Sequence, residues 1–332
     1  RIMVLSYMNT DWYINQLRRP NYESQSFKLS LDKKDYLQYG PNDALYVHES
    51  MKEGIDVKKY LQLLHAEHPA LRLFSQDGEP YSVLPSKLLE ISTSGSDELR
   101  NDVDREPTMK LSVIGNYLPK GALAFLDVLV SNEWQRPVYF NATSLNQIEL
   151  NVKPYVEQEG LVYRLTSAKS KSKDIRVNTV LMFKNLIVNA NYKNLLEQDV
   201  YFNYEDYHAR MIEPLRSSFN QLAVYLLHEG KEDQAINVLD QAMQILYSPH
   251  LRPSFSNLQT AEILLSVGKT RLAEKLSSAV FDSYYPTVKE DLVNNKQVDD
   301  LSIYLLQTSA DLLGKAGHLE YATKVNALDL FK

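Results

Sequence analysis

The C-terminal part of the chain carries a repeated pattern that strongly restricts its fold. From about residue 205, apolar and small residues follow helical spacing, and a Gly followed five residues later by an Ala occurs three times. In helical hairpins such a Gly makes the turn, and the small Ala lets the two helices approach closely. The three copies are Gly230 with Ala235, Gly268 with Ala273, and Gly317 with Ala322.

This order of residues is typical of tetratricopeptide-like hairpins, so we predict an all-α domain over residues 205–332. The copies lie farther apart than the roughly 34 residues of a regular tetratricopeptide repeat. We therefore expect degenerate repeats joined by extended loops, such as Tyr284 to Gln297.

The first 200 residues instead alternate strand-like and helix-like segments. Short apolar runs predict strands, and capping residues followed by apolar residues at helical spacing predict helices. This alternation predicts an α/β domain over residues 1–200 with an at least partly parallel sheet. The expected strands are 2–7, 87–91, 109–114 and 138–140, the expected helices begin near Asp11, Asp56 and Pro119, and the expected exposed loops are 92–107 and 167–174.

Composition excludes several functional classes. The chain has 36 Lys and Arg against 42 Asp and Glu, a formal net charge of −6, which argues against a general nucleic-acid binder. The absence of Cys excludes disulfides, thiol nucleophiles and Cys-based zinc sites. No uncharged apolar run reaches the roughly 18 residues that a membrane-spanning helix needs.

The start of the chain is unusual. The sequence begins at Arg1 and continues directly into Ile-Met-Val-Leu, without an initiator Met or a signal peptide. An apolar run of this kind indicates a strand already in progress. We therefore expect the chain to be a fragment of a longer protein.

The sequence contains few patterns typical of catalytic sites. The glycines do not form a dinucleotide-binding fingerprint, no Gly-x-Ser-x-Gly elbow is present, and Gly268-Lys269-Thr270 lacks the leading Gly of a phosphate loop. His65 and His68, three residues apart near a helix end, are weak candidates for metal ligands, because a third ligand cannot be placed. We predict no metal site, no catalytic residue and no cofactor in this chain.

Three stretches carry a resemblance to a known family. They are Asn9 to Pro20 (Asn-Thr-Asp-Trp-Tyr-Ile-Asn-Gln-Leu-Arg-Arg-Pro), Leu126 to Phe140 with its Asn-Glu-Trp-Gln-Arg-Pro-Val-Tyr-Phe end, and Tyr155 to Leu165. Together they resemble the soluble C-terminal region of a membrane protein family from Bacteroidetes-type bacteria. That family is similar to the animal transmembrane protein O-mannosyltransferases, which have a GT-C-type membrane glycosyltransferase core.

The resemblance implies a division of labour within a longer protein. The catalytic carboxylate of GT-C enzymes is expected in the membrane half, so no catalytic residue is carried onto this sequence. It further implies an integral membrane parent that uses a lipid-linked sugar donor, with this region on the periplasmic, extracytoplasmic face. The implied partners are an acceptor polypeptide or an envelope protein and the membrane half of the same chain.

Four residues in these motifs are candidate contacts for a ligand or acceptor: Asp11, Trp12, Tyr13 and Arg136. In one interpretation they line a pocket at the ends of the strands that finish at Tyr7 and Phe140. In the other they are structural: Asp11 caps a helix, Trp12 fills the core, and Arg136 pairs with Asp11 or Glu133.

Three functional hypotheses follow. The leading one is a non-catalytic extracytoplasmic domain of an O-mannosyltransferase-like enzyme that binds or positions the acceptor polypeptide. The alternative is a helical-repeat scaffold for protein–protein interaction at the cell envelope, without an enzymatic role. A third, weaker hypothesis is a self-contained α/β hydrolase or sugar-processing enzyme with a ligand or metal between Tyr7, Asp11 and Phe140.

Overall fold

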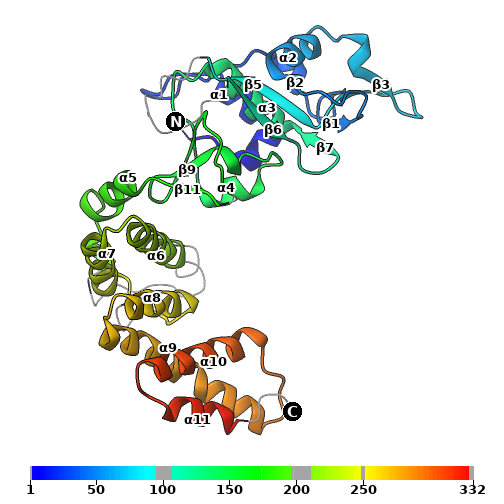
Figure 1. The fold of residues 1–332 in the computed structure, drawn as a ribbon. Helices are drawn as coiled ribbons and strands as arrows, with labels where there is room; N and C mark the ends of the chain where they lie inside the picture. Colours follow the sequence, from blue (N-terminus) through cyan, green and yellow to red (C-terminus); the bar gives the residue numbers. More distant parts are fainter. Residues whose placement is uncertain are drawn as a thin grey trace. The chain divides into compact units, whose positions relative to one another are not determined.

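The chain divides into two compact units. The computed structural model describes residues 2–94, 107–172, 174–195, 197, 211–247 and 251–328. Unit 1 comprises Arg1–Gln158 and Val162–Arg176, and unit 2 comprises Glu159–Leu161 and Val177–Lys332. Unit 1 is α/β and unit 2 is all-helical, so the predicted fold class is confirmed (Figure 1). The boundary expected between residues 200 and 205 lies outside the described residues.

The strands form three small sheets, two of which contain a parallel pair. Their orders are β3-β4-β1-β7, β2-β5-β6 and β11-β9-β10-β8. The pairs β1/β4 and β2/β5 are parallel, which confirms the partly parallel sheet. The strands are β1 (Ala44–Val47), β2 (Ile55–Asp56), β3 (Arg72–Phe74), β4 (Pro80–Leu84), β5 (Leu88–Ser92), β6 (Thr108–Ser112), β7 (Tyr117–Pro119), β8 (Tyr139–Phe140), β9 (Val156–Gln158), β10 (Tyr163–Leu165) and β11 (Arg176–Val177).

The core of unit 1 surrounds one helix. α3 (Lys120–Asn132) is buried continuously from Lys120 to Leu129, and it contacts α2, β7 and the 3-10 helix Leu5–Asn9. A helix that is buried on all sides is a core helix rather than an amphipathic surface helix. The other helices of this unit are α1 (Asp11–Leu17), α2 (Val57–His65), which is capped by Asp56 as expected, and α4 (Ala142–Gln147).

The prediction of a strand over residues 2–7 is wrong. The chain turns there into the 3-10 helix Leu5–Asn9, because the backbone N–H groups of Tyr7 and Met8 both donate to the carbonyl of Val4. The N–H of Val4 in turn donates to the hydroxyl of Tyr13, at 3.0 Å. A side chain on α1 therefore takes the hydrogen bond that a neighbouring strand would have taken. Of the two expected exposed loops, residues 95–106 and 173 lie outside the described residues.

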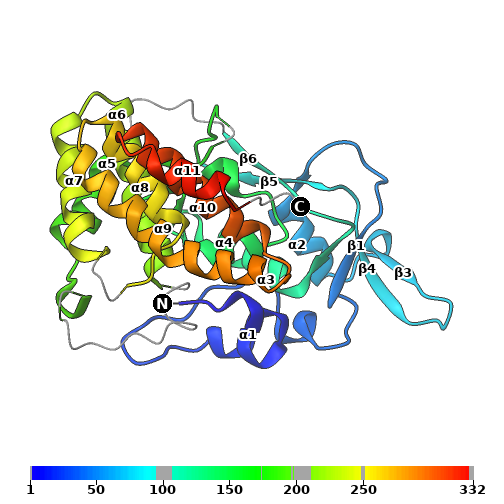
Figure 2. The ribbon, with the colours of Figure 1, turned by 90° about the horizontal axis from the view of Figure 1, so that it is seen from below.

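The described part of unit 2 is mainly helical, and short turns join α6 to α7, α8 to α9 and α10 to α11. α6 contacts α7, α8 contacts α9, and α10 contacts both α9 and α11 (Figures 1 and 2). Gly230, Gly268 and Gly317 occupy the turns with φ between 72° and 103°, the left-handed region that favours Gly. The helices are α5 (Thr179–Phe183), α6 (Glu213–His228), α7 (Glu232–Ile245), α8 (Phe255–Ser266), α9 (Thr270–Val293), α10 (Asp300–Lys315) and α11 (Glu320–Asn326).

The prediction of an extended loop from Tyr284 to Gln297 is also wrong, because α9 continues to Val293. Pro286 lies inside this helix, where its missing N–H costs a hydrogen bond. Packing on both sides of the proline compensates: Tyr285 stacks on Phe281 with 5.0 Å between ring centroids, and Val288 is buried. Asn295, with φ of 53°, follows the end of the helix.

Two separate hydrophobic cores lie within unit 2. The first contains residues of α6, α7 and α8 together with Ala273, Leu276 and Val280 of α9. The second is built on Phe281 and Val288 of the same helix, packed against α10 and α11. α9 therefore contributes to both cores, and Figure 2 shows it beside α8 and α10.

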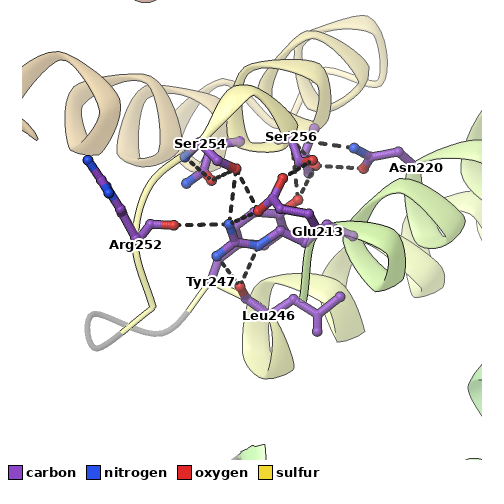
Figure 3. A network of polar contacts seen from close by, with 10 residues as sticks. Glu213, Asn220, Leu246, Tyr247, Arg252, Ser254 and Ser256 are labelled. Atoms are coloured by element: carbon purple, nitrogen blue, oxygen red, sulfur yellow. Dashed lines mark hydrogen bonds and ion pairs between the residues drawn. The ribbon is translucent and has the colours of Figure 1, made fainter. Parts of the chain in front are cut away.

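A buried arginine links the first helices of this unit. The guanidinium of Arg216 donates to the carbonyl of Leu246 through Nε at 3.0 Å and through Nη2 at 2.7 Å. Its Nη1 donates to Oε1 of Glu213 at 2.8 Å, and its Cζ lies 4.6 Å from the ring centroid of Tyr247. Glu213 also accepts hydrogen bonds from Ser254 and Ser256 just before and within α8 (Figure 3). All three guanidinium nitrogens of Arg216 thus donate hydrogen bonds, as the burial of a charged group requires.

Candidate functional site

One pocket of unit 1 has the size and lining of a ligand site. Its volume is about 970 Å³, near the upper end of what small-molecule and short-peptide sites occupy. It is bounded by the N-terminal segment, the loop after α1, the end of α3 and the segment that follows. The lining residues are Ile2, Met3, Pro20, Gln25, Ser26, Phe27, Lys28, Val128, Ser131, Asn132, Gln135, Arg136, Pro137, Val138, Tyr139, Phe140, Asn141, Ser144 and Val162.

A strained turn after α3 forms one wall. Glu133 and Trp134 both adopt left-handed backbone conformations, with φ of 47° and 59°, which are unfavourable for side chains of this size. Two contacts hold them: the indole Nε1 of Trp134 donates to the carbonyl of Ser92 at 2.9 Å, and Nδ2 of Asn132 donates to the carbonyl of Arg136 at 2.7 Å. The turn reverses the chain and brings Arg136 to the pocket.

Arg136 is positioned on an aromatic ring. Its guanidinium carbon lies 5.6 Å from the ring centroid of Phe27, a cation–π contact across the pocket wall. Lys28, the neighbour of Phe27, also lines the pocket. Within the ranges that the structure describes, no ion pair involves Arg136, and Glu133 pairs instead with Lys58 at 3.3 Å. The expected pairing of Arg136 with Asp11 or Glu133 is therefore not found there.

A buried carboxylate fixes the loop that carries Phe27 and Lys28. Oδ1 of Asp127 accepts hydrogen bonds from the backbone N–H and the hydroxyl of Ser30, at 2.7 and 2.6 Å. Oδ2 accepts from the N–H of Leu31 at 3.0 Å and from the hydroxyl of Tyr36 at 2.8 Å. Burial, together with the charge of Asp127, raises the pKa of Tyr36 well above its usual value. The carboxylate thus ties this loop to α3.

The predicted candidates on α1 do not line the pocket. Tyr13 is buried and holds the N-terminal segment through Val4, so it supports the wall formed by Ile2 and Met3. Oδ1 of Asp11 accepts from the N–H of Trp12 at 2.6 Å, a local contact at the helix start. Of the four residues, only Arg136 belongs to the pocket. Tyr7 and Phe140 were expected to end two strands beside a shared ligand. Of these two residues, only Phe140 lines the pocket.

The structural interpretation placed Trp12 in the core. Its side chain is instead 57% exposed. Its ring lies 6.1 Å from Tyr7 and 5.7 Å from Tyr13, measured between centroids. Tyr7 and Tyr13 meet edge to face at 5.6 Å. These three rings form a small aromatic cluster on the surface, distinct from the pocket lining.

His65 and His68 have different hydrogen-bond partners. Nδ1 of His65 lies 2.8 Å from Oδ2 of Asp35, whereas Nδ1 of His68 accepts the N–H of Ala70 at a helix start. Across the described part of the chain, no group of three or more His, Cys, Asp or Glu side chains is arranged to hold a metal ion. Likewise, none of the helices that the structure describes is long and apolar enough to span a membrane.

Sequence reasoning missed most of the pocket. Phe27 and Lys28 lie in a stretch with neither helical nor strand periodicity, which the motifs did not single out. They belong to a loop that Ser30 ties to Asp127, 97 residues away in sequence. The Arg-Pro pair after Trp134 was the one local signal, since Pro137 restricts the backbone next to Arg136.

The fold and the pocket together define a two-unit protein, an α/β unit that carries the pocket followed by helical hairpins. The family model described as TMEM260-associated domain 2 matches residues 1–184, and the chain belongs to that family. The match covers every residue that lines the pocket. It is consistent with a domain of a glycosyltransferase-related, TMEM260-like membrane protein. No curated protein and no solved structure matches the chain significantly.

Proposed function

We propose that the chain is a non-catalytic, acceptor-binding domain of a TMEM260-like protein glycosyltransferase. The observation that carries the proposal is the pocket around Phe27 and Arg136, which lies wholly within the segment that matches the family. Aromatic rings, amide side chains and cations lie on its walls, a combination that suits an extended polypeptide with polar backbone and mixed side chains.

In this proposal the chemistry occurs elsewhere in the parent protein. A membrane half of the same protein transfers a mannosyl-type sugar from a lipid-linked donor to Ser or Thr of the acceptor, and this domain presents that segment from the periplasmic or extracytoplasmic side. The parent is of Bacteroidetes-type bacterial origin. Asp11, Trp12 and Tyr13 act with the pocket as an accessory contact, because Trp12 is exposed beside Tyr7.

The alternative is a scaffold that binds an envelope protein through unit 2. A specific observation favours it: Phe255 of α8 and Tyr304 of α10 are both exposed, with 5.9 Å between their ring centroids. In this alternative the hairpins are tetratricopeptide-like, supported by the turn glycines and by buried Ala235 and Ala273. Helical repeats of that kind bind peptides along one face.

Amide hydrogen exchange on the whole chain separates the two functions. Unfolded Ser/Thr-rich secreted polypeptides are added, and the segments that gain protection are mapped. Acceptor binding at the pocket predicts protection of residues 20–28 and 131–144. Protection confined to α8 and α10, lost in the variants Phe255→Ser and Tyr304→Ser, supports the scaffold instead.

A transfer assay tests the division of labour. The isolated chain is incubated with a soluble sugar-phosphate donor and the same polypeptides, and glycosylation is read by mass spectrometry. We expect no transfer. Sugar transfer by this chain alone contradicts a non-catalytic role.

A further inference from the structure

The charge of the pocket differs in sign from that of the whole chain. Lys28 and Arg136 are the charged residues of its lining, and no Asp or Glu appears among the residues that line it. The chain as a whole has a formal net charge of −6. A concave site lined by one sign of charge concentrates ligands of the opposite sign.

The two cations are available to a ligand. Neither Lys28 nor Arg136 takes part in an ion pair within the described ranges, and both side chains are exposed. Phe27 supports one face of the Arg136 guanidinium, so the N–H groups along its edge can donate to both oxygens of a carboxylate in a bidentate arrangement. The bond from Asn132 to the Arg136 carbonyl limits the motion of the backbone that carries it.

The rest of the lining suits a polypeptide around that carboxylate. Ser26, Asn132, Gln135, Asn141 and Ser144 supply amide and hydroxyl groups that pair with peptide N–H and C=O groups. Phe27 and Phe140 supply aromatic surface for an apolar or ring-bearing neighbour.

We infer that this pocket selects acceptor segments that carry an Asp or Glu side chain close to the Ser or Thr to be modified. This inference rests on the proposed function, since it names the class of polypeptide that the same pocket binds. Arg136 binds the acceptor carboxylate directly, and Lys28 adds long-range attraction. Segments with Asn or Gln at the same place lose these charge-assisted hydrogen bonds and bind more weakly.

Binding of short labelled peptides to the whole chain, measured by fluorescence anisotropy, tests the inference. One peptide carries a Thr flanked by Asp, and its partner has Asn in place of each Asp. We expect about tenfold tighter binding of the acidic peptide at low salt, the size of a charge-assisted contact plus one screened charge. The difference shrinks as salt is added, because the site is open to solvent.

Variants assign the effect to the two cations. Arg136→Gln is expected to remove most of the preference for the acidic peptide, Lys28→Gln part of it, and Arg136→Lys is expected to keep an intermediate preference. Lys52→Gln, an exposed lysine of the same unit outside the lining, serves as the matched control and should change nothing. Equal thermal stability of all variants shows that they fold.

The outcomes separate the inference from the proposed function. If both peptides bind equally well and Arg136→Gln has no effect, the inference is overturned while acceptor binding stands. If neither peptide binds, the proposed function itself is contradicted. Mannose 1-phosphate and glucuronate are added as competitors: binding of these to the pocket in preference to the acidic peptide overturns the polypeptide assignment.

Discussion

The hydroxyl of Tyr36 donates to Oδ2 of Asp127 at 2.8 Å, and both side chains are completely buried. The same carboxylate accepts hydrogen bonds from Ser30, Leu31 and Ser131. Asp127 therefore joins the pocket loop and the 3-10 helix Lys33–Tyr36 to α3. Because Tyr36 is one of several donors to this carboxylate, removal of the Asp127 carboxylate should lower the stability of unit 1 more than removal of the Tyr36 hydroxyl.

Replacement of Asp127 by Ala should destabilise unit 1 strongly. Several buried donors lose their acceptor at once, which costs on the order of 3 kcal/mol or more. Tyr36→Phe removes one donor only and should cost about 1 kcal/mol. Urea denaturation followed by tryptophan fluorescence measures both. Equal costs for the two variants contradict the joining role of the carboxylate.

Replacement of Arg216 by Met should destabilise unit 2. The change leaves Glu213 without its ion-pair partner and leaves the Leu246 carbonyl without either of its guanidinium donors, at a cost of about 3–5 kcal/mol. Arg271→Met, at an exposed position on α9, is the matched control and should change stability by less than about 0.5 kcal/mol. Circular dichroism at increasing urea reports on the helices.

A double mutant tests whether Arg216 and Glu213 act as a pair. Removing both charges, as Glu213→Gln with Arg216→Met, should cost less than the sum of the single changes, because no unpaired charge remains. Strict additivity of the two costs shows that they act independently.

The turn glycines give a prediction with an internal control. Gly268 has φ of 74°, so Ala at this position should cost about 1 kcal/mol of backbone strain. Gly314 lies inside α10, where an added Cβ would meet only Leu319, at the ordinary distance of 3.9 Å. Gly314→Ala should therefore stabilise the protein by roughly 0.5–1 kcal/mol. Thermal unfolding measures the change in melting temperature of each variant. Changes of the same sign in Gly268→Ala and Gly314→Ala contradict the different backbone roles given to the two glycines.

Alkaline pH should weaken unit 2 through Tyr247. Burial raises the pKa of Tyr247 to about 12, against about 10 in an unfolded chain. The unfolded state therefore loses its phenolic proton first, and the stability contributed by the neutral phenol is full below about pH 10 and lost as pH rises toward about 12. Tyr247→Phe should show a shallower loss of stability over this range. Urea midpoints at several alkaline pH values, with absorbance at 295 nm to follow ionisation, check the slope.

Local signals predicted the parts of the fold that are locally determined. Asp56 caps α2 as expected, and the turn glycines of unit 2 have the left-handed φ that the repeated pattern implied. Each depends on one side chain and its nearest backbone, so sequence spacing is sufficient. The predictions for residues 2–7 and 284–297 were wrong where tertiary contacts prevailed: the Tyr13 hydroxyl in the first case, and packing around Phe281 and Val288 in the second.

The pocket was predictable only in fragments, for the same reason. Arg136 was a candidate because it belongs to a stretch that carries the family resemblance, but its partner Phe27 lies more than a hundred positions earlier in an irregular loop. Nothing local marks such a loop as the wall of a site. Its position follows from Asp127, a residue whose helical spacing identifies it only as part of a buried helix.

The course of α9 has a consequence for how unit 2 unfolds. Repeats that touch only their neighbours can open one at a time, from either end. Here one helix supplies Leu276 to the first core and Val288 to the second, so neither core can lose it alone. The helices on either side of α9 are thereby coupled, and we expect unit 2 to unfold as a single cooperative block.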